Sequence, residues 1–308
     1  SATLTLAAQG DINIASGGSI AAGGANRSLN VNLYAGTQLG GGSPGSVASQ
    51  ISMSSGTSIN TGQSGNLTAI SKGDVTLANA TLGGALTVTT NNGAFAQVTG
   101  SALTVTGAAT VNAGTKDVSF NSASNQLSGA ISSTGTGAVT IKNTLATNLG
   151  TIGASGAAAL SLDVTTTNAA VTQSGPAFVT GDTTVRAGSG AVTLNQAGNQ
   201  FTGGINSTGT GAVTLVNSTA TSLRNIGTNG GAVASLSVTT NNANVSQSGT
   251  SYVAGTTTVA AGSGAVNLTN TGNQLAGAVS STGTGAVTLL NATDVVLGAI
   301  GTGGSPAA

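Results

Sequence analysis

The sequence predicts an all-β fold, a parallel β-helix (β-solenoid) of about a dozen coils, from three observations. The phrase NQFTGGINSTGTGAVTL at 199–215 has near copies at 125–141 and 273–289, so a 74-residue unit repeats along the chain. Apolar residues alternate with Ser, Thr or Asp in short runs, which is typical of strands with one buried face. Aromatic residues make up only 2% of the chain, which suits a narrow solenoid core better than a two-sheet sandwich or a propeller.

The repeat extends over most of this unit. VTQSG at 171–175 matches VSQSG at 245–249, and AGSGAVTL at 187–194 matches AGSGAVNL at 261–268. About eight strand-like runs per unit, at three strands per coil, predict nearly three coils of roughly 25 residues, and four coils of about 18 residues are the alternative. No window carries the spacing of an amphipathic helix, so we expect no helix.

The chain divides into an irregular beginning and a regular remainder. Residues 66–308 form the regular solenoid with the 74-residue super-repeat, and residues 1–65 form Gly-rich first coils in which the repeat is weakest. Three Gly runs in the first part, GGSI at 17–20, AGGAN at 22–26 and LGGGSPGS at 39–46, predict loops that bulge from the coils.

Each part of the repeated phrase has a predicted structural role. Phe201 and Ile205 face the core, STGTG at 207–211 makes a tight corner in which Gly supplies positive φ, and AVTL begins the next strand. Asn recurs at one position of the phrase and predicts a ladder of turn-forming side-chain amides, with ligand binding as the less favoured alternative. These residues are Asn125, Asn199 and Asn273.

The composition is nearly uncharged. Six basic and six acidic residues give a net charge of zero, and charged residues make up 4% of the chain, whereas about a quarter is usual in soluble domains. Charge repulsion therefore does little to keep copies apart, and we expect self-association. Composition alone would also allow a disordered low-complexity chain, but the positive mean hydropathy of +0.27 argues against it.

The inventory of reactive side chains predicts no enzyme. The chain has no His and no Cys, and its acidic residues are six scattered Asp, so we expect no catalytic, cofactor-binding or metal-binding residue. Two neighbouring charge pairs, Lys116 with Asp117 and Asp182 with Arg186, are interpreted as surface ion pairs of little energetic value. Phosphate-loop and calcium-turn patterns are missing, no apolar run is long enough for a membrane span, and no nucleic-acid partner is expected.

The cycle AVTQSGPAFVTGDTTVRAGSGAVTLNQAGNQFTGGINSTGTGAVTL resembles the β-strand repeats of large bacterial exoproteins of the filamentous-haemagglutinin type. The resemblance covers about residues 66–308. It implies a right-handed parallel β-helix on an exported adhesin or matrix fibre, usually secreted by the two-partner route. The amino-terminal secretion domain of that family, with its Asn-Pro-Asn type motifs, is not found in this sequence, and no catalytic residue carries over.

These observations predict a non-catalytic structural protein, outside a bacterium or on its outer surface, that acts as a surface adhesin or as the subunit of an extracellular filament. Neither SATLTL at the start nor LGAIGTGG at the end resembles a cap, so we expect end-to-end stacking of copies or continuation in a longer chain. Function is expected within residues 1–65, on the outer polar face or at these ends. The partners are other copies, a host or cell surface, and a glycan.

Two alternative functions depend on surface side chains. A carbohydrate-binding or carbohydrate-active β-helix would need outward aromatic residues, but the six aromatics mostly lie on strand-like runs and are expected to fill the core. An ice-binding solenoid would need Thr in every coil, but clusters such as Thr165–Thr167 and Thr256–Thr258 are expected only about once in three coils. The aromatic residues are Tyr34, Phe95, Phe120, Phe178, Phe201 and Tyr252.

Overall fold

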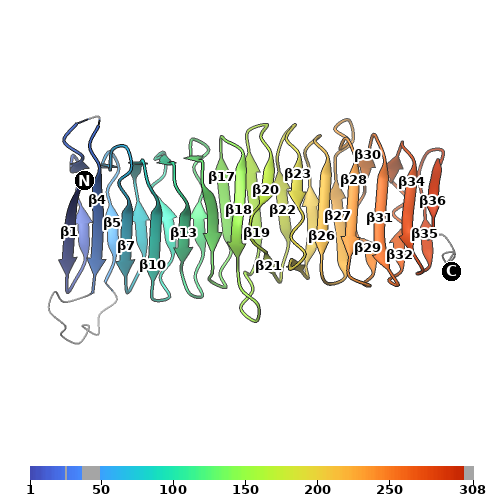
Figure 1. The fold of residues 1–308 in the computed structure, drawn as a ribbon, viewed down its shortest axis with the longest axis horizontal. Helices are drawn as coiled ribbons and strands as arrows, with labels where there is room; N and C mark the ends of the chain where they lie inside the picture. Colours follow the sequence, from blue (N-terminus) through green and yellow to red (C-terminus); the bar gives the residue numbers. More distant parts are fainter. Residues whose placement is uncertain (25, 37–48, 302–308) are drawn as a thin grey trace. The chain divides into compact units, whose positions relative to one another are not determined.

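A computed structural model describes residues 1–24, 26–36 and 49–301. The predicted all-β solenoid is confirmed, because strands of successive coils pair in parallel and no helix occurs among the described residues (Figure 1). The strands form two compact units, residues 1–159 and 160–308.

The first unit has three walls of parallel strands, each named here after its first strand. The β1 wall consists of β1 (Ala2–Ala8), β4 (Leu29–Ala35), β7 (Leu67–Ser71), β10 (Leu86–Thr90), β13 (Ala109–Asn112), β16 (Ala130–Ser133) and β18 (Thr147–Ile152). The β2 wall consists of β2 (Ile12–Ile14), β5 (Ile51–Met53), β8 (Val75–Leu77), β11 (Phe95–Gln97), β14 (Val118–Phe120) and β17 (Val139–Asn143). The β3 wall consists of β3 (Ser19–Ala21), β6 (Ser58–Asn60), β9 (Asn79–Leu82), β12 (Leu103–Val105) and β15 (Gln126–Leu127).

The core of the first unit is a stack of alternate residues. In β10, Leu86 and Val88 are buried while Thr87 between them is exposed, as the period-two pattern predicts. Leu86 pairs with Leu67 of the preceding coil, so like side chains lie above one another. The buried rings of Phe95 and Phe120, one coil apart, are tilted against each other at 4.8 Å between centroids.

The second unit has two long walls and two short sheets. The β19 wall consists of β19 (Leu162–Thr166), β22 (Thr183–Arg186), β25 (Gly204–Ser207), β27 (Thr221–Ile226), β29 (Val245–Gln247), β32 (Val266–Leu268) and β35 (Val287–Leu289). The β20 wall consists of β20 (Val171–Gln173), β23 (Val192–Leu194), β26 (Val213–Asn217), β28 (Leu236–Thr240), β31 (Thr257–Gly262), β34 (Val279–Gly283) and β36 (Leu297–Ile300). The short sheets pair β21 (Phe178–Val179) with β24 (Gln200–Phe201), and β30 (Tyr252–Val253) with β33 (Gln274–Leu275).

Residues one repeat apart lie on opposite walls of the second unit. Val171 lies in β20, whereas Val245, the equivalent residue of the next repeat, lies in β29 of the β19 wall. Pairing partners in this unit are as few as 18 positions apart, from Val279 to Leu297, and as many as 24, from Thr221 to Val245. At about 21 residues per coil, the repeat therefore contains about three and a half coils. The predictions of three or four coils per repeat were both wrong, because each assumed a whole number of turns.

Because each repeat contains about three and a half coils, the two short sheets lie at opposite edges of the second unit. The chain passes through β21 on its way from β20 to β22, that is, from the β20 wall to the β19 wall. It passes through β30 on its way from β29 to β31, in the opposite direction. A solenoid winds in one direction throughout, so these two crossings occur at opposite edges. Equivalent residues of β21 and β30 therefore lie at opposite edges of the second unit.

The Gly-rich segments of the first part have different structures. GGSI enters β3 through a tight turn in which Gly17 has a φ of +82°. AGGAN belongs to the connection between β3 and β4, apart from Ala25, which lies outside the described residues. The segment LGGGSPGS at 39–46, with Pro44, also lies outside the described residues.

Candidate functional surfaces

The Asn of the repeated phrase is part of a buried hydrogen-bond network. Asn199 is fully buried, and its Nδ2 donates to Gln173 Oε1 at 2.9 Å and to the Val216 carbonyl at 3.0 Å. Its Oδ1 accepts from the Ala177 N–H at 2.8 Å and from Gln173 Nε2 at 3.0 Å. With donors and acceptors satisfied inside the protein, the amide ties three coils together and has no group left for a ligand.

The same network occurs in each repeat. Asn125 bonds to Gln97, the Leu103 N–H and the Lys142 carbonyl, and Asn273 bonds to Gln247, the Ser251 N–H and the Leu290 carbonyl. The expected ladder was therefore right in its structural role. The amides do not bond to one another, however: Asn199 and Asn273 of the second unit are more than three coils apart, and each of the three amides takes a Gln and nearby backbone as partners instead.

A second recurring Asn, which the sequence reasoning missed, completes the edge strand of the β3 wall and of each short sheet. Asn217 Oδ1 accepts from the Phe201 N–H at 2.9 Å, and its Nδ2 donates to the Phe201 carbonyl at 3.0 Å. Asn143 does the same for Leu127 in β15, and Asn291 for Leu275 in β33. One carboxamide thus replaces the missing next strand, so that the edge strand keeps no unpaired backbone group at its buried residue. The signal was available, because these Asn residues also recur at 74-residue intervals.

The glycines of STGTG are required by close approach of successive coils. A Cβ on Gly209 would overlap the Gly188 carbonyl, and one on Gly211 would overlap the Gly190 carbonyl. The prediction of positive φ in this phrase was wrong, since that conformation is found one coil earlier, at Gly188, with a φ of +58°. The corner and strand assignments were right: Phe201 and Ile205 are buried and β26 begins at Val213.

The ion pairs differ from those expected. Asp163 pairs with Arg186, and Asp182 pairs with Arg224 at 2.9 Å between Oδ2 and Nη1. The predicted pairing of Asp182 with Arg186 was wrong because partners come from different coils: Asp163 and Arg186 are one coil apart, and Asp182 and Arg224 are two coils apart. All four side chains are about half exposed, so these pairs contribute little to stability.

Carboxylates of the first unit support neighbouring coils. Asp117 Oδ1 accepts the Ala138 N–H at 2.9 Å and, among the described residues, forms no ion pair with Lys116. Asp11 and Asp74 accept the N–H groups of Gln50 and Ala94 in the same way. No three His, Cys, Asp or Glu side chains gather where they could hold a metal ion in the part of the chain that the structure describes.

The outer face of the β20 wall carries one unbroken column of hydroxyl groups. Its members in successive coils are Thr193, Thr214, Ser237, Thr258 and Ser280. Thr occupies three of these five positions and Ser the other two, so hydroxyl groups recur in successive coils here although Thr does not occur in every one. The parallel column two residues further along reads Val216, Thr239 and Ala260, so the hydroxyl groups do not form a two-column array there.

The aromatic residues divide between the core and the surface. Phe95, Phe120 and Phe201 are buried, as predicted. Tyr34, Phe178 and Tyr252 are partly exposed, so the expectation of core packing was wrong for them. In β21 and β30 the neighbouring Val179 and Val253 are fully buried, which directs Phe178 and Tyr252 outward.

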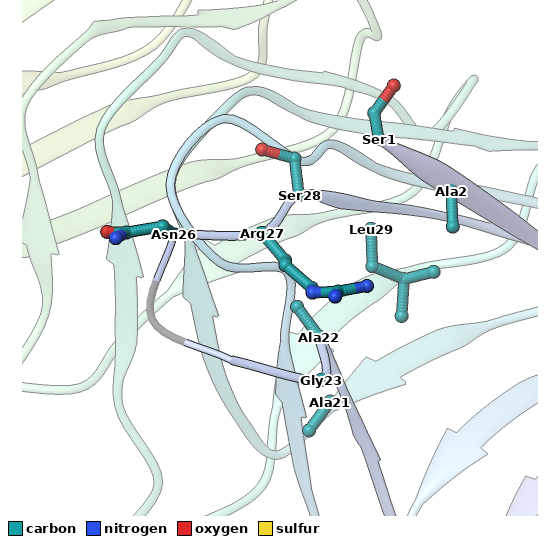
Figure 2. A pocket seen from close by; sticks show the side chains of 9 residues that line it. All are labelled: Ser1, Ala2, Ala21, Ala22, Gly23, Asn26, Arg27, Ser28 and Leu29. Atoms are coloured by element: carbon teal, nitrogen blue, oxygen red, sulfur yellow. The ribbon is translucent and has the colours of Figure 1, made fainter.

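The described surface has a hollow of about 340 Å³ at the first coil. Figure 2 shows the Arg27 side chain extending toward Leu29, while Asn26 points the other way. Ala2 and Ala21 belong to β1 and β3, which pair on one side only among the described residues, so the hollow is the open edge of that coil. The lining residues are Ser1, Ala2, Ala21, Ala22, Gly23, Asn26, Arg27, Ser28 and Leu29.

The last described coil exposes apolar side chains. Leu297 pairs with the buried Val279 and so occupies an inward position, yet it is 63% exposed. Leu290, Val295, Val296 and Ile300 of the same coil are also exposed. None of the described residues belongs to a helix able to cross a membrane.

Comparison with known proteins identifies one family. The model of a family described as Repeats of unknown function (DUF5649) matches three consecutive segments, residues 64–134, 136–208 and 210–282. These segments follow the 74-residue repeat read from the sequence and together cover more than half of the chain. No curated protein and no solved structure matches the chain.

Proposed function

The chain belongs to the family of repeats of unknown function (DUF5649), and we propose that it is a non-catalytic structural protein of the bacterial cell surface or extracellular matrix. In this role the β-solenoid is a scaffold that displays its outer faces as an adhesin or joins other copies in a filament. It catalyses no reaction of its own.

One observation carries the proposal: the residues that the repeat keeps constant serve the stacking of coils. Asn199 ties three coils together, Asn217 completes a strand edge, and Gly211 lets two backbones approach. Asn199 and Asn217 are buried, and their amides bond to groups of neighbouring coils, which favours a scaffold.

The extracellular location is supported by composition and by resemblance. A chain with 4% charged residues and outward Ser, Thr and Asn has little charge repulsion to oppose association with other copies or surfaces. The repeats also resemble those of filamentous-haemagglutinin-type exoproteins, which are exported through an outer-membrane partner. The adhesive and the filament role both follow from a neutral, regular surface.

Self-association is proposed to occur end to end. The support is the last described coil, where Leu297 has the inward orientation of a core residue but is not covered by any residue that the structure describes. Stacking of the first coil of a second copy would bury this side chain and pair the edge of β36. The contact is heterologous, and repeated contacts of this kind produce an open filament.

The assembly experiment compares Leu297→Asp with Thr288→Asp in the purified chain. Thr288 lies on β35, one strand before β36, and points outward, so it is a matched control for an added charge. We expect wild-type protein and Thr288→Asp to sediment as species that grow with concentration and to form ordered fibres in electron microscopy. Leu297→Asp should remain a single small species.

Two results would count against end-to-end assembly. One is a wild-type chain that sediments as a monomer at every concentration and shows only isolated particles. The other is equal assembly by Leu297→Asp and the wild type, which would place the contact elsewhere. Circular dichroism of each variant checks that the added charge has not unfolded the coil.

A further inference from the structure

We propose that Phe178 and Tyr252 are equivalent contact residues for neutral polysaccharide chains, displayed at the two opposite edges of the second unit. The proposal rests on the adhesive role above and names its partner. The two residues are one repeat apart and lie on the two short sheets, which the half-integral repeat places at opposite edges.

Each aromatic ring lies next to an exposed amide. Phe178 pairs in register with Gln200, and Tyr252 pairs in register with Gln274, so ring and amide are one coil apart, about 4.8 Å along the axis. Both Gln residues are exposed. An aromatic ring can cover the C–H face of a pyranose, and a carboxamide can both donate to and accept from sugar hydroxyl groups.

The edge with Phe178 continues into a hollow. The short sheet of β21 and β24 ends at β24, so the next coil has a short corner in place of a strand at this edge. In this corner the Ser218 N–H and Oγ both donate to the Asn199 carbonyl. The resulting hollow of about 290 Å³ is lined by the apolar Ala197 and Val216 and by polar residues, among them Ser218, Thr239 and Asn241. Hydroxyl and amide groups therefore follow the aromatic ring over several coils, as an extended sugar chain requires.

Charge argues for a neutral partner. Residues 176–180, 196–202, 216–220 and 239–244, which form this edge, include no charged side chain. The nearest acidic group in sequence, Asp182, is paired with Arg224. Stacked nucleobases would also suit an aromatic ring, but a nucleic acid needs basic residues along its phosphates. An uncharged polysaccharide fits both the rings and the absence of charge on this edge.

The opposite placement of the two sites has a consequence for matrix formation. One copy can hold two polysaccharide chains at once, one at each edge, and so cross-link them. The first repeat has Thr104 at the corresponding position, so its short strand lacks the ring. Thr104 therefore provides a matched control position on the same scaffold.

The experiment measures retardation of the full chain in native gels that contain hydroxyethyl cellulose, galactomannan or laminarin, and retention on insoluble cellulose and chitin. The proteins are wild type, Phe178→Ala, Tyr252→Ala, the double variant and Thr104→Ala. We expect at least one of these polysaccharides to retard the wild type and Thr104→Ala equally. Each single variant should bind that polysaccharide about three- to tenfold more weakly, and the double variant should not be retarded.

The viscosity of a polysaccharide solution distinguishes a chain with two binding sites, which can cross-link, from a chain with one. Wild-type protein should raise the viscosity of the soluble polysaccharide that it binds, whereas each single variant should bind without raising it. The proposal is overturned if no probe retards the wild type, if the double variant is retarded as much as the wild type, or if the chain instead binds poly(dT). Sedimentation of the double variant should match the wild type, so a failure of the scaffold proposal remains distinguishable from a failure of this one.

Discussion

At the residue scale, side-chain amides bond to backbone N–H and C=O groups that have no hydrogen-bond partner on a neighbouring strand. Each short sheet ends inside the solenoid, and the last strand would leave an N–H and a C=O unpaired in the core. Asn143, Asn217 and Asn291 each bond to both groups of one residue. A carboxamide is the smallest side chain that presents a donor and an acceptor side by side, which explains why Asn recurs there.

This role predicts a large cost for Asn217→Ala. The substitution leaves the Phe201 N–H and carbonyl unpaired in a buried position, at about 1–3 kcal/mol for each group, so unfolding in guanidinium chloride should show a loss of about 2–4 kcal/mol. Asn241→Ala, at an exposed position, is the control and should change stability by less than about 0.5 kcal/mol. Equal effects of the two substitutions would refute the edge-completing role.

Buried threonines of the second unit predict opposite responses to valine. Thr183 is fully buried, and its hydroxyl has no hydrogen-bond partner among the described residues, whereas the buried Thr221 hydroxyl accepts from Asn217 Nδ2 at 3.1 Å. Thr183→Val should therefore raise the free energy of unfolding by about 1 kcal/mol, and Thr221→Val should lower it by a similar amount. Thermal unfolding of the pair measures this difference, and a lower stability of Thr183→Val would contradict it.

At the element scale, the corners determine how closely coils approach. The glycines of STGTG are adjacent to the backbone of the preceding coil, so the phrase is a spacing device, and its repetition keeps the coils in register. Gly211→Ala would overlap the Gly190 carbonyl and should cost about 2 kcal/mol. Gly198→Ala, whose Cβ would lie 3.4 Å from the Pro176 Cβ, should cost less than about 1 kcal/mol. Unfolding midpoints of the two variants give the comparison, and similar midpoints would argue against close approach as the reason for glycine.

The sequence allows the inward-facing residues to be predicted for long strands but not for two-residue strands. Alternation predicts the buried residues of longer strands such as Leu86–Thr90, because several residues of one period agree there. Phe178–Val179 and Tyr252–Val253 are each a single pair of residues, and a pair contains no period, so the sequence did not indicate which residue faces inward. The larger aromatic ring was assigned to the core, but Val179 and Val253 occupy the inward positions of these pairs. The outward contact residues could therefore not be predicted.

At the scale of the whole repeat, the 74-residue interval was evident from the sequence but its number of coils was not. Some coils have a short strand between the two long walls, and others have a corner with an Asn in its place, so the number of residues per coil varies. Val279 pairs with Leu297, 18 positions on, whereas Val213 pairs with Leu236, 23 positions on, and no single coil length can be divided out of the interval. Only the pairing of strands shows that successive repeats are half a turn apart. Equivalent residues of two successive repeats therefore lie on opposite sides of the second unit.

The central claim, that the repeat contains a half-integral number of coils and so alternates between two faces, can be tested by one distance measurement. The chain has no Cys, so cysteine pairs at Thr193 with Asn267, and at Thr193 with Ser280, can be spin-labelled without background. Ser280 lies on the same wall as Thr193, four coils along, or about 19 Å. Asn267 is nearer along the axis but on the opposite wall.

Double electron–electron resonance should therefore give the longer distance for the pair Thr193 and Asn267, although these residues are closer in sequence, because their labels point outward from opposite walls. A shorter distance for this pair than for Thr193 and Ser280 would mean that the 74-residue repeat is a whole number of coils. That result would contradict the alternation of faces and, with it, the pairing of Phe178 and Tyr252 at opposite edges.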